Sequence, residues 1–275
     1  MTGDWFLTMQ KAIGIFDSGV GGLTVLKELM AVLPQENTIY LGDTARVPYG
    51  IRSPETVTRY SFENTQFLLS QEIKMLVVAC NTASAISLDA VKREFPLPVL
   101  GVLEPGARAA VAATRTGKIG VIGTEATIGS GAYEKAVRSI SPGIEVFSQA
   151  CPLFVSLVEE GWTDNDVAEL VARRYLETLR DCGIDTLVLG CTHYPLLKKV
   201  IARVVGGGIT LIDSATETAR EVAEVLAKLN WIRPDRGEVV RRYFVTDSPS
   251  RFERVGKLFL QDTRLTAEQV RVGGA

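Results

Sequence analysis

The sequence has no long hydrophobic run and no excess of charge of either sign. Its longest apolar stretches end well short of the roughly 20 residues that a transmembrane helix needs. The net charge of −2 gives no reason to expect a nucleic-acid or anionic-membrane partner. The first segment, MTGDWFLTMQK, lacks a basic start and does not resemble a signal peptide. We therefore expect a soluble, cytoplasmic protein.

Cysteine and histidine are scarce. The four cysteines, Cys80, Cys151, Cys182 and Cys191, form no close pair in the sequence. This argues against a disulfide framework and favours a reducing compartment. His193 is the only histidine. Chemistry that needs a thiol or an imidazole therefore has few candidates.

What the chain does contain is a regular alternation of strand and helix signals. Short apolar runs at 12–16, 38–41, 76–79 and 99–103 alternate with helical patterns at 23–33, 55–71, 83–95 and 105–114. Ser53 and Pro54 form a good cap and first-turn pair for one of these helices. The alternation predicts an α/β fold with parallel sheets and crossover helices.

The series then starts again, because KIGVIG at 118–123 resembles KAIGIF at 11–16. Three matches have similar spacing and indicate a duplicated α/β unit. We expect two similar, pseudo-symmetric lobes of mainly parallel sheet flanked by helices, with the active site in the cleft between them. The matches are Ile13 with Ile119, Leu103 with Ile212 and Cys80 with Cys191, which lie 106, 109 and 111 residues apart.

The last segment is predicted to fold back onto the first lobe. Thr216–Leu229 has helical periodicity, Arg242–Val245 reads as a short strand, and Asp247-Ser248-Pro249 looks like the cap of an amphipathic helix ending at Leu260. The predicted first lobe comprises residues 11–104 plus 215–275. The predicted second lobe comprises residues 105–214.

Cys80 and Cys191 each end an apolar run that has the pattern of a buried parallel strand. Ligands of open α/β sheets bind at this end of the strands. A helix-start pattern follows each cysteine, which predicts a thiol pKa lowered by the helix N-terminus. Cys151 and Cys182 lack such a context, and we interpret them as structural residues.

His193 lies two residues beyond Cys191 and is a candidate acid or base. A protease-like cysteine–histidine nucleophile would leave Cys80 unexplained. A zinc site formed by Cys80, Cys191 and His193 would lack the local ligand spacing of structural zinc sites. A thiol redox protein would be expected to carry a C-x-x-C motif, which is absent.

Three further segments carry candidate polar residues. In the turn DSGVGG (17–22), Asp17 either caps the following helix or serves a substrate ammonium or a proton transfer. LGDTARVPYG (41–50) has the density of polar groups of a binding loop. Glu159 and Glu160 fit equally well as the solvated end of a helix.

Five motifs in order closely resemble those of bacterial glutamate racemases, a family in the cofactor-independent aspartate/glutamate racemase group. They are IGIFDSGVGGLTVL, YLGDTARVPYG, VVACNTASA, PLFVSLVEEGW and LVLGCTHYPLL, and the resemblance covers roughly residues 11–229. It implies interconversion of L- and D-glutamate for peptidoglycan synthesis and cell shape. It also implies no pyridoxal phosphate or other cofactor, no metal, and a homodimer.

The resemblance also implies roles for individual residues. Cys80 and Cys191 would be the catalytic pair, with Cys80 deprotonating D-glutamate and Cys191 deprotonating L-glutamate. Asp17 would assist Cys80, and His193 and Glu159 would assist Cys191; aligning the V-E pair favours Glu159 over Glu160. The implied substrate-binding residues are Asp17, Ser18, Pro48, Tyr49, Gly50, Asn81, Thr82, Thr124, Thr192 and His193.

Two rival functions remain open at this point. An aspartate or hydantoin racemase would share the two-cysteine frame and differ in the pocket for the side chain. A two-lobed ligand-binding module resembling periplasmic binding proteins would not need paired cysteines.

Overall fold

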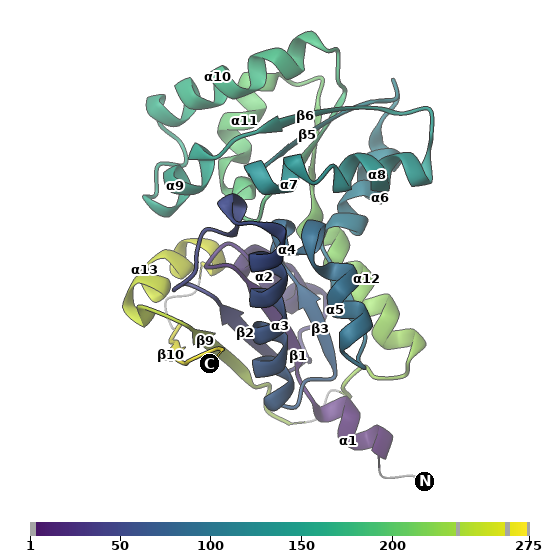
Figure 1. The fold of residues 1–275 in the computed structure, drawn as a ribbon, viewed down its shortest axis with the longest axis vertical. Coiled ribbons are helices and arrows are strands. Elements are labelled where there is room, and N and C mark those ends of the chain that lie inside the picture. The colour runs from purple at the N-terminus through teal and green to yellow at the C-terminus, as the bar shows by residue number, and fades with distance from the viewer. Residues whose placement is uncertain (1–3, 235–236, 262–264, 274–275) are drawn as a thin grey trace.

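The computed structural model describes residues 4–234, 237–261 and 265–273, and shows an α/β protein with two parallel sheets (Figure 1). The first sheet has the order β10-β9-β2-β1-β3-β4 and the second has the order β6-β5-β7-β8. Their strands are β1 (Ile13–Asp17), β2 (Thr38–Gly42), β3 (Met75–Val78), β4 (Val99–Gly101), β5 (Lys118–Gly123), β6 (Glu145–Ala150), β7 (Thr186–Gly190), β8 (Thr210–Asp213), β9 (Arg241–Val245) and β10 (Glu268–Gln269). The predicted α/β class with two lobes is confirmed.

Helices flank both sheets (Figure 1). Those of the first part of the chain are α1 (Asp4–Gln10), α2 (Leu23–Val32), η1 (Tyr49–Ile51), α3 (Pro54–Ser70), α4 (Asn81–Ile86), α5 (Leu88–Glu94) and α6 (Leu103–Ala113). The others are α7 (Glu125–Gly129), α8 (Ala132–Ile140), α9 (Leu153–Glu159), α10 (Asp166–Asp181), η2 (Tyr194–Leu197), α11 (Lys198–Val205), α12 (Ser214–Lys228) and α13 (Pro249–Leu260). Within the described ranges, none is both long and apolar enough to cross a bilayer.

Strand register supports the sequence repeat. β1 pairs Ile13 with Met75 of β3, and β5 pairs Ile119 with Thr186 of β7. These pairs reproduce the spacings of 106 and 111 residues. The third match was wrong, because Leu103 begins α6 whereas Ile212 lies within β8. A two-residue apolar match is too short to fix a register.

The C-terminal tail adds to the first sheet. β9 pairs in parallel with β2, and β10 pairs with β9. α13 packs against α2, and α12 packs against both α2 and α6. The tail therefore brings α13 beside the glycine-rich turn that precedes α2. Within the predicted range 215–275, residues 235–236, 262–264 and 274–275 lie outside the described part of the chain.

Two predicted helix boundaries need correction. The helix expected over 83–95 is two helices, α4 and α5, which meet at Ser87; the Ser87 hydroxyl lies 2.8 Å from the Ala83 carbonyl oxygen and 2.7 Å from Ser61 Oγ. Ser53 caps α3 as predicted. Ser248 does not cap α13: it has a left-handed backbone (φ 46°) and makes no side-chain cap bond.

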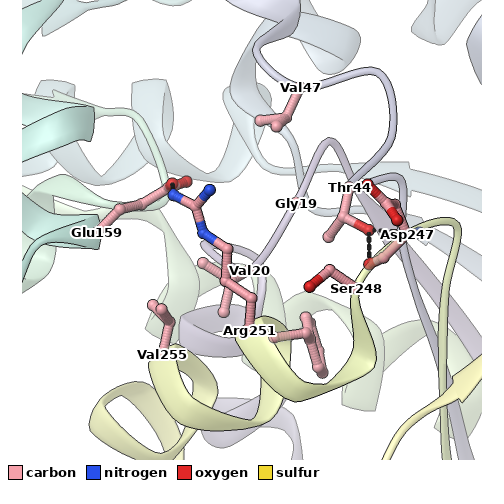
Figure 2. A pocket seen from close by; sticks show the side chains of 10 residues that line it. Gly19, Val20, Thr44, Val47, Glu159, Asp247, Ser248, Arg251 and Val255 are labelled. Atoms are coloured by element: carbon pink, nitrogen blue, oxygen red, sulfur yellow. Dashed lines mark hydrogen bonds and ion pairs between the residues drawn. The ribbon is translucent and has the colours of Figure 1, made fainter.

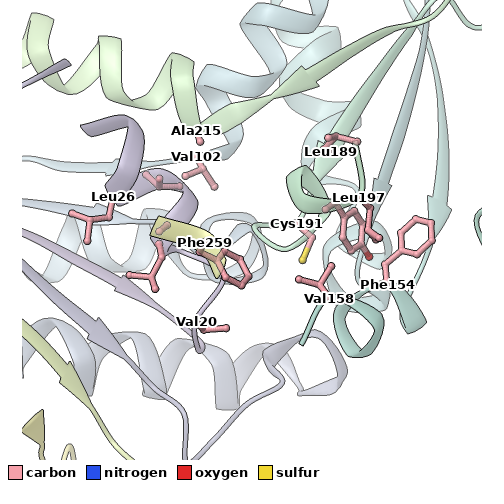
Figure 3. Close-up of a cluster of buried hydrophobic side chains, with 14 of the residues drawn as sticks. Val20, Leu26, Val102, Phe154, Val158, Leu189, Cys191, Leu197, Ala215 and Phe259 are labelled. Atoms are coloured by element: carbon pink, nitrogen blue, oxygen red, sulfur yellow. The ribbon is translucent and has the colours of Figure 1, made fainter. Parts of the chain in front are cut away.

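One apolar cluster joins the two lobes (Figure 3). It contains Leu26 of α2 and Phe259 of α13 together with Phe154 of α9 and Leu189 of β7. Cys191 is part of the same cluster. Both lobes therefore share a core that lies next to one of the candidate cysteines.

Candidate active site

Four strand ends supply the candidate residues. Asp17 ends β1 and Ser18 follows it, Cys80 follows β3, Thr124 follows β5, and Cys191 follows β7. Parallel strands present their carboxyl ends at one edge, so each lobe gathers its polar groups at a single edge. Both thiols are nearly inaccessible, with 5% of Cys80 and 7% of Cys191 exposed.

Hydrogen bonds show that the two edges face each other. The Thr192 hydroxyl donates to Asp17 Oδ1 (3.4 Å). The hydroxyls of Thr82 and Thr124 lie 3.0 Å apart, and the Tyr133 hydroxyl donates to Asn81 Oδ1 (2.6 Å). Each bond connects a residue of the first lobe to one of the second. The structure thus brings the predicted residues of both lobes into one buried polar zone.

Cys80 lies beside Ser18 and Asp17. Its Sγ is 3.7 Å from Ser18 Oγ, and it directly precedes α4. Burial raises the pKa of Cys80 to about 12, and the charge of Asp17 adds to this rise; the backbone N–H of Ala83 and the hydroxyl of Ser18 oppose it. The predicted lowering of this pKa by the helix N-terminus was therefore wrong, because desolvation and a neighbouring carboxylate outweigh one short helix.

Asp17 is fully buried and stabilises the glycine-rich turn. Its Oδ2 accepts a hydrogen bond from the Gly19 N–H (2.9 Å), and its Oδ1 accepts from Thr192 of the other lobe. The N-cap position of α2 is Gly22. Burial raises the Asp17 pKa, although the charge of His193 opposes this rise. Asp17 is therefore both a turn residue and part of the inter-lobe zone.

Cys191 has a different set of neighbours. Its Sγ lies 3.9 Å from His193 Nδ1, and His193 Nε2 lies 3.3 Å from Glu159 Oε1. Burial by itself lowers the His193 pKa, but the bonds to Cys191 and Glu159 outweigh it and raise this pKa to about 10. The bond to His193 lowers the Glu159 pKa. At neutral pH a cationic imidazole thus lies between the Cys191 sulfur and the Glu159 carboxylate.

The loop between β2 and α3 contacts the second lobe. The Tyr49 hydroxyl donates to Asp43 and accepts from Asn64 Nδ2 (3.0 Å), so it is used within the first lobe. A Cβ atom added to Gly50 would lie 2.5 Å from Thr124 Cβ. Gly50 therefore lies directly against Thr124 of the second lobe, whereas the Tyr49 hydroxyl bonds within the first lobe and Pro48 is exposed.

Several site residues had no signal in the sequence. Thr127 lies 3.1 Å from the Thr82 hydroxyl, and Tyr133 bonds Asn81. The ring of Phe259 in α13 packs edge-on against His193, with ring centroids 5.8 Å apart. Arg251 of α13 lies 3.2 Å from Glu159 Oε2. These contacts depend on how distant helices pack, which no local motif records.

A cavity of about 260 Å³ borders the site on the α13 side (Figure 2). Gly19 of the turn, Glu159 of α9 and Arg251 of α13 line it. Its lining therefore combines first-lobe residues with Glu159, the carboxylate that faces His193.

The other two cysteines have structural surroundings. Cys151 is buried, and burial raises its pKa. Cys182 donates to the Thr178 carbonyl within α10 (3.2 Å). All four thiols are free. Among the residues whose placement is known, no three His, Cys, Asp or Glu side chains are grouped as a metal would require, so the zinc hypothesis has no support.

Comparison with known proteins gives consistent matches. Residues 23–222 match the model of the Asp/Glu/Hydantoin racemase family. A glutamate racemase of Geobacter metallireducens is 63% identical over 250 residues, covering 91% of this chain and 93% of that protein. The crystal structure of glutamate racemase from Francisella tularensis in complex with D-glutamate has a TM-score of 0.90 at 39% identity, covering 96% of this chain and 98% of its own. Glutamate racemase RacE1 from Bacillus anthracis has a TM-score of 0.92 at 43% identity, with coverage of 96% and 98%. The chain belongs to the Asp/Glu/Hydantoin racemase family, within its glutamate racemase branch.

Proposed function

We propose that this protein interconverts L- and D-glutamate by proton transfer between two cysteines. The observation that carries the proposal is the placement of Cys80 and Cys191. They follow equivalent strands of two facing sheets; Cys80 contacts Ser18 and feels the charge of Asp17, and Cys191 contacts His193. Inverting an α-carbon needs a base on one face of the substrate and an acid on the other, and two opposed thiols supply both.

The surroundings of the two thiols favour one starting arrangement. The raised pKa of Cys80 keeps it as a thiol, able to donate a proton. His193, which is cationic at neutral pH, is the partner of Cys191. In the L-to-D direction, Cys191 thiolate takes the α-proton and Cys80 gives its proton to the opposite face. Cys80 is then a thiolate and Cys191 a thiol, which is the arrangement needed for the reverse reaction.

Polar groups around the cysteines would hold the substrate. Asn81 Nδ2 is buried and has no hydrogen-bond partner among the described residues, which suits an amide that donates to a ligand carboxylate. The Thr82, Thr124 and Thr192 hydroxyls surround the same zone, as does Ser18. N–H and O–H donors in a dry cleft stabilise the charge that develops on the carboxylate as the α-proton leaves.

The wider role follows the family resemblance. We propose that the protein supplies D-glutamate for peptidoglycan in the cytoplasm, works as a homodimer and needs no cofactor. We also propose lobes of 11–104 plus 215–275 and of 105–214. The pairing of β9 with β2 supports the return of the tail to the first lobe.

Cysteine variants test the two-base mechanism. Cys80→Ala and Cys191→Ala are each expected to abolish racemisation while the fold, followed by circular dichroism, stays intact. Cys182→Ala is the matched control, since this residue caps the C-terminal end of α10 and its thiol bonds the Thr178 carbonyl, and it should keep normal turnover. A Cys80 or Cys191 variant with near-normal turnover would contradict the mechanism.

Substrate and cofactor need a separate assay. L-glutamate and L-aspartate are incubated with the enzyme in D₂O, and α-proton exchange is followed by NMR. We expect exchange with glutamate only, unchanged by metal chelators and carbonyl reagents. Exchange with aspartate at a similar rate, or activity restored by zinc or pyridoxal phosphate after such treatment, would overturn the substrate or the cofactor proposal respectively.

A further inference from the structure

Helix α13 contacts the Cys191 side of the site at two points. Arg251, near its start, forms an ion pair with Glu159 (3.2 Å), and Phe259, near its end, packs edge-on against the His193 ring. Figure 2 shows Arg251 extending from α13 toward Glu159 across the edge of the cavity. α13 belongs to the tail that joins the first lobe, whereas Glu159 and His193 belong to the second. The Arg251–Glu159 pair is therefore a bond between lobes.

We propose that Arg251 is a positioning residue that holds Glu159 against His193, so that Cys191, His193, Glu159 and Arg251 form one chain of contacts closed by α13. The inference rests on the proposed function, because His193 matters only if Cys191 takes part in proton transfer. It adds to that function a residue outside the five family motifs, from a helix that contributes no catalytic group.

The geometry of Glu159 supports this role. Its two oxygens are divided between partners: Oε1 faces His193 Nε2 and Oε2 faces Arg251. Glu159 is the last residue of α9, and 18% of its side chain is exposed at the cavity edge. Without a second anchor this carboxylate can turn toward water. Contacts to both carboxylate oxygens fix the rotamer of Glu159, and a fixed Glu159 Oε1 orients the His193 imidazole.

The charges around His193 determine whether loss of Arg251 raises or lowers the His193 pKa. Cys191 lies on its own segment, Asp17 faces it from the end of β1, and Glu159 faces it from α9. The Arg251 guanidinium stands one residue further out and is 57% exposed, so water screens its direct repulsion of the imidazolium. Loss of Arg251 therefore acts mainly through Glu159. When that acceptor moves away, protonated His193 loses a hydrogen bond and its pKa falls.

His193 is the only histidine in the chain, which makes a direct test possible. Untagged full-length protein labelled with ¹⁵N-histidine gives one imidazole, whose titration is followed by NMR. The wild type should titrate near pH 10. Arg251→Gln should titrate at a pH at least about one unit lower, because a charge-assisted hydrogen bond contributes on that scale.

Two variants serve as controls. Arg254→Gln removes the same charge from an exposed position on the same helix and should titrate like the wild type. Arg251→Lys retains a cation that can reach Glu159, so its His193 should titrate close to the wild-type pH. In kinetics, Arg251→Gln should lower kcat for L-glutamate roughly tenfold with little change in KM, because Asn81 and the threonine hydroxyls that are proposed to hold the substrate carboxylate are untouched.

The outcomes are distinguishable. An Arg251→Gln protein that is folded and titrates like the wild type would overturn the positioning role, whatever its activity. If Arg254→Gln shifts the titration equally, the effect is only one of net charge, and the inference falls as well. The titration needs no turnover, so failure of the two-cysteine mechanism would appear separately, in the Cys80 and Cys191 variants.

Discussion

Gly21, in the glycine-rich turn, is where one added methyl group should do most damage to the site. A Cβ atom there would lie 2.5 Å from His193 Nδ1 and still closer to Thr192 Oγ1. Ordinary contact between such atoms is about 3.5 Å, so His193 or the turn must shift by about 1 Å. His193 Nδ1 faces Cys191 Sγ at 3.9 Å, and the shift would disturb this contact directly.

The cost of Gly21→Ala can be estimated from that displacement. A misplacement of about 1 Å in an active site lowers the rate by roughly 10²-fold, or about 2.7 kcal/mol of transition-state stabilisation. Overpacking costs a further ~1–3 kcal/mol of folding free energy. The assay is L-glutamate racemisation followed by circular dichroism, with kcat and KM measured separately and stability measured by urea unfolding.

Gly19→Ala is the matched control in the same turn. Its added Cβ would lie 3.4 Å from the nearest atom, Val47 Cγ2, which a small adjustment can accommodate. We expect activity within a few-fold of the wild type. If Gly21→Ala folds and keeps near-normal kcat/KM, or if both variants lose activity equally, then close packing of the turn against His193 does not set the geometry of Cys191.

Three further predictions concern stability. The raised pKa of His193 means that its contribution to folding is complete below pH 6.5 and is lost as pH rises toward about 10; the gap in unfolding free energy between wild type and His193→Gln in urea should therefore narrow from pH 6 to pH 10. Asp185 accepts hydrogen bonds from Thr114 (2.7 Å) and from the N–H groups of residues 115 and 116, which lower its pKa against the opposing effect of burial. Asp185→Asn should cost about 2–3 kcal/mol at pH 7, and the difference should shrink in acid as the wild-type carboxylate becomes protonated. Lys74 and Glu36 form a fully buried ion pair (2.6 Å), so Lys74→Met should destabilise by ~3–5 kcal/mol in urea unfolding, and a loss below 1 kcal/mol would show that the remaining Glu36 is readily neutralised or hydrated.

The sequence was sufficient to predict the fold because the information is local. A strand buried on both faces reads as an apolar run, and the residue that ends the run marks the sheet edge. The register of β1 with β3 and of β5 with β7 agrees with the repeat spacing read from Ile13 and Cys80. The break at Ser87 depends on a hydroxyl bonding to Ser61 of α3, and the entry to α13 depends on Thr44 bonding Asp247. Hydrogen bonds between segments that are distant in the sequence do not change its hydrophobic periodicity, so the pattern cannot predict them.

For the candidate site, the sequence motifs identified the candidate residues but not the direction in which their surroundings shift their pKa values. A helix start after Cys80 predicted a lower pKa, and the family resemblance placed Asp17 beside Cys80, but neither showed that burial and the Asp17 charge together raise the pKa of this thiol. For the same reason Arg251 and Phe259 had no signal. Their effect on His193 arises only when the tail returns to the first lobe and places α13 against the second.

The repeat and the difference between its halves together explain how one site can act on two mirror-image substrates. Equivalent strand ends place Cys80 and Cys191 at the facing edges of the two sheets, and the proposed inversion needs one reactive group on each face of the substrate. Equivalent surroundings would leave both thiols in the same protonation state, and proton transfer needs one acid and one base. The first lobe surrounds Cys80 with a buried carboxylate, and the second pairs Cys191 with a cationic imidazole. Helix α13 contacts the Cys191 side of the site, where Phe259 packs against His193 and Arg251 pairs with Glu159. In the proposed mechanism, the two cysteines occupy equivalent positions in the two lobes, and the difference between their neighbouring side chains allows one to act as the acid and the other as the base.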